Sequence, residues 1–111
     1  MTFINQANHY GYLEICKAGT AQGEFTFDVS PSKQGPITVA SGSCSPAIKI
    51  EAGTVQITEQ AVDGSTMVGC ETFPMTHQLE CDKDALTSTV HVQGGDKTRQ
   101  TIATIINDKT P

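Results

Sequence analysis

The stretch Tyr12-Leu13-Glu14-Ile15-Cys16-Lys17 alternates apolar and polar side chains, and this alternation decides the fold class. Successive side chains of an extended strand point to opposite faces, so Leu13 and Ile15 share one face and their polar neighbours share the other. Residues 24–29 repeat the pattern. No stretch keeps the spacing of three and four residues that an amphipathic helix requires. The sequence therefore predicts strands with one buried face.

Shorter segments of the same kind follow along the chain, separated by turn-forming residues. The expected strands are residues 12–17, 24–29, 37–40, 47–50, 54–59, 66–73, 86–93 and 98–107. Gly94-Gly95 predicts a hairpin between the last two. Short strands at this spacing predict an all-β sandwich or barrel of about seven to nine strands.

Composition limits the function. The chain has 111 residues, the size of one domain, with 17% charged residues and a formal net charge of −5. An acidic surface disfavours phosphate backbones, so nucleic acid is not an expected partner. No apolar run approaches the ~20 residues that span a bilayer, so membrane insertion is not expected. No basic, hydrophobic leader opens the chain, which leaves a mature fragment or a chain that is not exported.

The four cysteines decide between these two origins. Their spacings are wide and unequal, and no histidine lies at zinc-ligand spacing from a cysteine pair, so no metal or other cofactor is expected. An even number of cysteines predicts two disulfides, and therefore an extracellular or cell-surface location. Three connectivities are open, and we favour Cys16–Cys44 and Cys70–Cys81 because each pair is nearest in the chain.

Three polar residues interrupt the apolar faces. Lys17 follows two inward positions of its strand, and Glu59 and Asn107 each do the same on theirs. Burial lowers the pKa of a lysine, which yields the neutral amine of a nucleophile, and raises the pKa of a glutamate, which keeps a proton available for transfer. If the three converge, Lys17 and Asn107 can form an isopeptide bond with loss of ammonia. The alternative is that each is a rim residue, because strand ends are where polar side chains return to solvent.

Three motifs carry a resemblance to a known family. Leu13-Glu14-Ile15-Cys16-Lys17 resembles the first strand of Cna B-type (prealbumin-like, transthyretin-like) domains of Gram-positive surface proteins and pilins. Ile57-Thr58-Glu59-Gln60-Ala61-Val62-Asp63-Gly64 resembles the acid-bearing strand, and Thr104-Ile105-Ile106-Asn107 the final strand. The resemblance covers residues 12–107 and implies an Ig-like/prealbumin-like sandwich. It also implies that Lys17 is the nucleophile, Glu59 the catalytic acid/base and Asn107 the acceptor.

The sequence departs from the family pattern at Cys16, at Ser43-Cys44-Ser45-Pro46 and at Ile105, where the family usually has a Phe. The cysteines are similar to those of a secreted branch of prealbumin-like domains, in which disulfides replace the isopeptide bond or add to it.

The amino terminus is treated apart from the main domain, as a strand or linker over residues 1–11 ahead of a sandwich over 12–111. Thr2-Phe3-Ile4-Asn5 resembles Thr104-Ile105-Ile106-Asn107. It is interpreted as the tail of a preceding repeat, an edge strand on its own sheet, or a strand donated to a neighbouring copy. The expected partners are therefore neighbouring repeats or copies of the same chain.

No catalytic motif of a multiple-turnover enzyme is present, so the chain is not expected to be an enzyme beyond a single intramolecular reaction. Two functions remain open. The first is a structural stalk, spacer or filament module. The second is an adhesin-type module that binds sugar or protein through its loops. An exposed cluster of Tyr10 and Phe73 would favour binding, and dispersed aromatic residues would favour the structural role.

Overall fold

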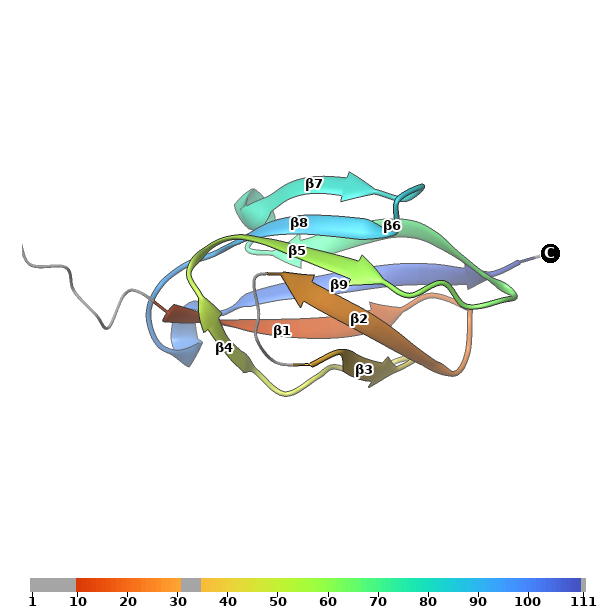
Figure 1. Cartoon of the computed structure of the whole chain (residues 1–111), viewed down its shortest axis with the longest axis horizontal. Helices are drawn as coiled ribbons and strands as arrows, with labels where there is room; N and C mark the ends of the chain where they lie inside the picture. The colour runs from red at the N-terminus through yellow and green to blue at the C-terminus, as the bar shows by residue number, and fades with distance from the viewer. Residues whose placement is uncertain (1–9, 31–34, 111) are drawn as a thin grey trace, which may run out of the picture.

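The computed structural model describes residues 10–30 and 35–110, which form two sheets packed as a β-sandwich (Figure 1). This confirms the predicted all-β class. The elements are β1 (Tyr10–Ala18), β2 (Glu24–Ser30), β3 (Ile37–Ala40), β4 (Ile48–Glu51), β5 (Gly53–Glu59), β6 (Ser65–Phe73), η2 (Met75–His77), β7 (Gln78–Asp82), β8 (Thr87–Val92), η3 (Lys97–Arg99) and β9 (Thr101–Lys109). Among these residues, no helix has the length and apolar character needed to cross a membrane.

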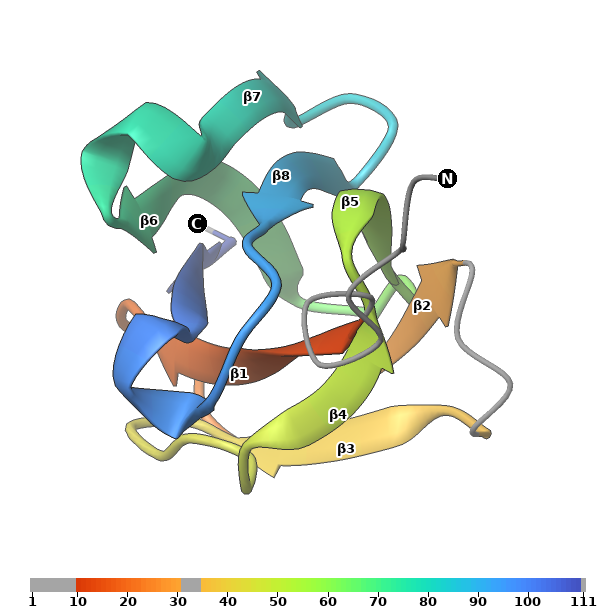
Figure 2. The ribbon, with the colours of Figure 1, turned by 90° about the vertical axis from the view of Figure 1, so that its left-hand side faces the viewer.

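The two sheets differ in size. One has four strands in the order β4-β1-β9-β6, and the other has five in the order β3-β2-β5-β8-β7. Figure 2 shows the stack approximately along the strands, with β1 and β4 on one side and β5 and β8 on the other. The paired strands are antiparallel, except that β1 and β9 are parallel neighbours. The first residue of β1 and the last of β9 therefore lie at opposite ends of the molecule (Figure 1).

The core lies between the sheets and follows from the alternation of each strand. In β1, every second residue from Gly11 to Lys17 is buried, and β9 shows the same pattern from Thr101 to Asn107. The largest fully buried apolar side chains come from five strands of both sheets: Leu13, Ile15, Phe25, Phe27, Val55, Ile57, Val90, Val92 and Ile105.

The predicted hairpin at Gly94-Gly95 is wrong, since β8 and β9 lie in different sheets. The chain crosses between the sheets here, and the backbone N–H of Gly95 donates to the carbonyl of Tyr10. A Cβ on Gly11 would lie 2.1 Å from the carbonyl oxygen of Gln93, so the chains approach closely. At this crossing, the missing side chain of Gly11 lets two backbone segments come into contact, and the glycines do not form a two-residue hairpin turn.

Several boundaries also differ from those expected. Strand β1 begins at Tyr10, two residues before the expected start at 12, because Gly11 continues the pairing with β4 but gives no hydrophobic signal. Strand β7 was not predicted, since most of its side chains are exposed and no apolar alternation marks it. Strand β9 begins at Thr101, because residues Lys97–Arg99 form a 3-10 turn capped by Asp96. The Thr2–Asn5 segment lies outside the described residues.

Candidate functional site

The three polar residues that interrupt the apolar faces are all buried. Lys17 is 2% exposed, Glu59 3% and Asn107 1%. Each continues the inward side of its strand, after Ile15 in β1, Ile57 in β5 and Ile105 in β9. The alternative interpretation as rim residues is therefore wrong.

The three side chains meet between the two sheets. Lys17 and Asn107 lie on the adjacent strands β1 and β9, and Glu59 reaches them from β5 in the facing sheet. The Nζ of Lys17 donates to Oδ1 of Asn107 at 2.7 Å, and Nδ2 of Asn107 donates to Oε2 of Glu59 at 2.9 Å. Lys17 Nζ also donates to the carbonyl of Ile105 at 3.1 Å. The carboxamide therefore lies between the amine and the carboxyl group.

The two oxygens of Glu59 face the two nitrogens of the site. Oε2 accepts from the amide nitrogen of Asn107, while Oε1 lies 3.9 Å from Nζ of Lys17. Within the described part of the chain, Oε1 has no hydrogen-bond partner. A buried oxygen without a partner is costly, and protonation reduces that cost by removing the charge.

Burial shifts both ionisable groups toward their neutral forms. It lowers the pKa of Lys17 to about 8, although the charges of Glu59 and Asp108 oppose this shift. Burial also raises the pKa of Glu59, against the hydrogen bond from Asn107 and the charge of Lys17. The ring of Phe25 lies 4.3 Å from Nζ and favours the cation. The lowered pKa increases the fraction of Lys17 that carries the neutral, nucleophilic amine near neutral pH.

Backbone contacts position Lys17 from the outer side of β1. Its N–H donates to the carbonyl of Ser43 at 2.9 Å, and Gly42 donates to its carbonyl at 2.9 Å. The disulfide between Cys16 and Cys44 joins the same two segments next to these bonds. The segment around Cys44 therefore fixes the strand at the residue that carries the amine.

Asn107 is positioned by the turn that follows β1. The N–H of Ala21 donates to its carbonyl at 3.2 Å. Gly19 has a φ of +104°, and a Cβ there would lie 1.9 Å from the same carbonyl oxygen. No apolar pattern marks Gly19, although a glycine directly after an interrupted apolar strand is a usable signal of close backbone approach.

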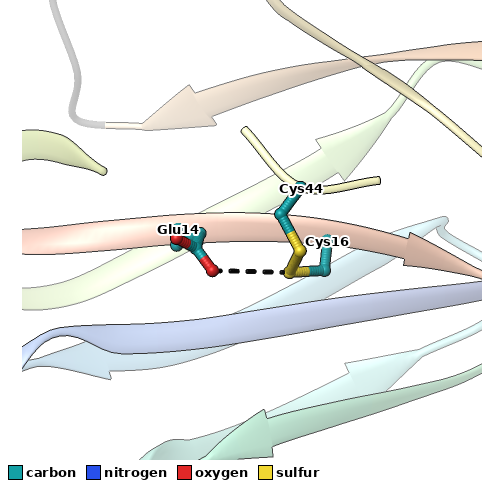
Figure 3. A group of neighbouring side chains, drawn as sticks. All are labelled: Glu14, Cys16 and Cys44. Carbon is teal, nitrogen blue, oxygen red and sulfur yellow. Dashed lines mark hydrogen bonds between the residues drawn. A yellow bond between two sulfur atoms is a disulfide. The ribbon is translucent and has the colours of Figure 1, made fainter. Parts of the chain in front are cut away.

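The structure contains two disulfides, Cys16–Cys44 and Cys70–Cys81, the two pairs favoured from the sequence. Figure 3 shows Glu14 beside the first, with Oε2 at 3.7 Å from the Cys16 sulfur. A disulfide sulfur carries no proton to donate and no thiolate charge. This group therefore offers a metal one carboxylate rather than three ligands.

A second contact between a nucleophilic group and a carboxamide lies between β6 and β7. It is partly buried and joins Thr72 to Gln78. The hydroxyl of Thr72 donates to Oε1 of Gln78 at 2.5 Å. The amide nitrogen of Gln78 donates to the carbonyls of Glu80 and Thr89 and to the hydroxyl of Ser88. Both residues lie in the loop of chain that the Cys70–Cys81 disulfide closes. No sequence pattern marks the contact between Thr72 and Gln78, because neither residue interrupts a recognised apolar alternation.

Tyr10 and Phe73, the exposed aromatic residues in the described part of the chain, do not form one cluster. Tyr10 lies beside Lys49 of β4, with Nζ 5.5 Å from the ring centroid. Phe73 is 70% exposed on β6, at the opposite edge of the four-stranded sheet. Strand β9 lies between the two strands that carry them, which is the dispersed arrangement.

Comparison with known proteins gives a fold likeness. No protein-family model matches the chain, and no curated protein matches it. Two crystal forms of a bacterial adhesin from Mobiluncus mulieris, described as containing intramolecular disulfide, isopeptide and ester bond cross-links, are similar in structure. Their TM-scores are 0.64 and 0.59 at 16% and 13% identity, over 91% of this chain. The chain spans 42% of the adhesin chain in each, and the likeness shows the fold alone.

Proposed function

We propose that the chain is a structural module of an extracellular bacterial surface protein, a stalk, spacer or filament unit. It is locked by two disulfides and by an isopeptide bond between Lys17 and Asn107. The observation that carries the proposal is the buried contact of Lys17, Glu59 and Asn107. The two disulfides and the fold of the adhesin support the extracellular setting. The motifs that resemble Cna B-type domains point to the same chemistry.

The reaction balances with the groups present. The neutral amine of Lys17 attacks Cγ of Asn107, so that the Nζ–Cγ bond forms and the Cγ–Nδ2 bond breaks. The protonated carboxyl of Glu59 delivers its proton to Nδ2, which leaves as ammonia, and Glu59 then regains a proton from Nζ. The hydrogen bond of 2.9 Å between Oε2 and Nδ2 supports delivery of a proton to the leaving nitrogen. The other oxygen, Oε1, faces Nζ at 3.9 Å, so the lysine must move closer for its proton to pass. The fold supplies the proximity that such an amide exchange requires.

The position of the bond suits a module that bears load. Strands β1 and β9 are parallel neighbours. The start of β1 and the end of β9 lie at opposite ends of the molecule (Figure 1). Tension applied across these ends shears β1 past β9. A covalent bond from Lys17 to Asn107 joins the two strands directly, so force passes from one to the other without unfolding the residues between them.

The test is the intact mass of the purified, reduced and denatured chain. We expect it to be lighter than the sequence mass by one ammonia, with a fragment in which residues 17 and 107 are joined. Glu59→Gln keeps the shape of the acid but cannot shuttle protons, so its mass should equal that of its own sequence.

A succinimide at an asparagine also releases ammonia, so Lys17→Met is the matched control. It keeps every asparagine and removes only the amine. Loss of ammonia that persists in Lys17→Met, or a wild-type chain at its full sequence mass, contradicts the proposed bond.

A binding role is the second candidate, favoured by one observation. Phe73 and Met75 are 70% and 83% exposed, and together with Ile102 they line a surface groove of about 530 Å³. Exposed apolar side chains beside a groove are a feature of interaction sites. Binding on glycan or protein arrays that is lost in Phe73→Ser would support this role, and silence of the wild-type chain on both arrays would count against it.

A further inference from the structure

The carboxamide of Asn107 has a third partner outside the Lys17–Glu59–Asn107 set. Nδ2 of Asn107 also donates to the hydroxyl oxygen of Ser65 at 3.2 Å. Ser65 is the first residue of β6, and its own hydroxyl donates to the carbonyl of Val62 at 3.2 Å. Because a serine hydroxyl has one proton, the oxygen faces Asn107 as an acceptor.

This arrangement fixes which way the carboxamide points. Both hydrogens of Nδ2 have acceptors, one on Glu59 and one on Ser65, while Oδ1 accepts from Lys17. A turned carboxamide would place its oxygen against the lone pairs of Ser65 and its N–H groups against the amine of Lys17. While its proton is donated to Val62, Ser65 therefore favours the same orientation as Lys17 and Glu59 do.

We propose that Ser65 is a positioning residue for the isopeptide bond, which holds the leaving nitrogen of Asn107 beside Glu59. This inference rests on the proposed function. Ser65 also lines a surface pocket of about 290 Å³, together with Thr20, Gly64 and Lys109. The nitrogen that leaves is thus next to a residue that borders open solvent, and the pocket gives the ammonia its way out.

The test follows the appearance of the cross-link in newly made full-length chain. Cell-free synthesis under oxidising conditions is stopped in acidic denaturant at successive times, and the fraction lacking one ammonia is read from the intact mass. Ser65→Ala should slow the reaction about tenfold, the effect of losing about one hydrogen bond. Ser65→Thr, which keeps the hydroxyl, should restore the rate.

Asn107→Asp separates orientation from a general structural effect. Both ends of a carboxyl group are oxygens, so orientation has no consequence, and the cross-link then forms with loss of water. Ser65→Ala should therefore slow the chain that keeps Asn107 but leave the rate of the Asn107→Asp variant unchanged. Equal slowing in both backgrounds, or no slowing in either, overturns the inference while leaving the cross-link intact. A wild-type chain that never loses ammonia instead overturns the proposed function.

Discussion

Two regions of the molecule bring a nucleophile into contact with a carboxamide, each next to a disulfide. In one, the amine of Lys17 meets Asn107, and Cys16 precedes the lysine directly. In the other, the hydroxyl of Thr72 meets Gln78 inside the loop closed by Cys70 and Cys81. Contact alone therefore does not distinguish a cross-linking site from a structural hydrogen bond.

The surroundings of the two carboxamides do distinguish them. Nδ2 of Asn107 donates to the carboxyl of Glu59, whose other oxygen faces the nucleophile. Within the described residues, the amide nitrogen of Gln78 donates to two carbonyls and a hydroxyl, none of which acts as a general acid or base at neutral pH. In the proposed reaction, the carboxyl of Glu59 links the attacking atom to the leaving group, whereas the hydrogen bonds of the Gln78 nitrogen include no carboxyl group among the described residues.

The regions also differ in how much a covalent bond would stabilise the fold. Lys17 and Asn107 are 90 residues apart in the chain, whereas Thr72 and Gln78 are 6 apart. A cross-link restricts the unfolded chain more when it closes a longer loop. The bond that we propose, from Lys17 to Asn107, is therefore the one that would have the larger effect on stability.

The largest expected effect comes from removing the amine. The proposed cross-link predicts that Lys17→Met lowers the free energy of unfolding by about 4–5 kcal/mol relative to the wild type, the loop-closure value for this separation. Urea denaturation of both proteins with disulfides intact measures the difference. A change no larger than that of a surface substitution would mean that the two regions are equivalent.

Removing the disulfides tests the comparison in a second way. In the Lys17→Met background, alanine at both Cys16 and Cys44 should cost about 3.5 kcal/mol, and alanine at both Cys70 and Cys81 about 3 kcal/mol. In the chain with Lys17 intact, only the first pair of substitutions should slow the loss of ammonia. The reason is that Cys44 directly follows Gly42 and Ser43, whose backbone groups hydrogen-bond to Lys17. Its disulfide to Cys16 holds this segment against β1. Equal cross-linking rates in the two double variants would contradict this positioning role.

Period-two alternation predicted most of the first region, because a polar residue in register with buried neighbours is conspicuous in sequence. Lys17, Glu59 and Asn107 all continue apolar faces, so the pattern indicated burial, while their places at strand ends left the rim interpretation open until the structure showed them buried. Their convergence did not, since alternation gives the face of a strand but not its neighbours in the sheet. The parallel pairing of β1 with β9 and the place of β5 in the facing sheet supply that information.

The second region could not be predicted in the same way. Strand β7 is mostly exposed and is held at the edge of its sheet by pairing with β8 and by the Cys70–Cys81 disulfide. Neither feature produces an apolar pattern. The contact of Ser65 with Asn107 could not be predicted for a related reason. Ser65 directly follows the turn at Asp63-Gly64, where a serine is common and indicates no buried contact.

A smaller effect is expected from pH, and only in the first region. In Lys17→Met, Glu59 stays buried without its cation, and burial keeps its folded pKa above the unfolded value of 4.5. The folded state then holds a proton that the unfolded state releases. Stability is therefore fully present below pH 4.5 and is lost as the pH rises through the folded pKa. The slope is at most about 1.4 kcal/mol for each unit of pH.

Urea denaturation of Lys17→Met across this range measures the slope, and the double variant Lys17→Met/Glu59→Gln is the matched control. The glutamine has no proton to release, so its curve should lack this decline. A stability that rises with pH in Lys17→Met would mean that Glu59 is ionised in the folded state, which contradicts the neutral pair on which the reaction depends.

The smallest effect is expected in the second region. Thr72→Val keeps the shape of the side chain and removes the hydroxyl, so it should cost about 1 kcal/mol, the value of one hydrogen bond. The Gln78 nitrogen keeps its three acceptors, which hold its side chain in place. Because the hydroxyl of Thr72 donates to the carboxamide oxygen of Gln78 rather than to a carboxyl group, we expect Thr72→Val to differ in mass from the wild type only by the substitution itself. If the wild-type chain loses two ammonias and Thr72→Val loses one, the hydroxyl is a nucleophile too. That result would show that a carboxamide in this fold can form a covalent bond without a carboxyl group beside it.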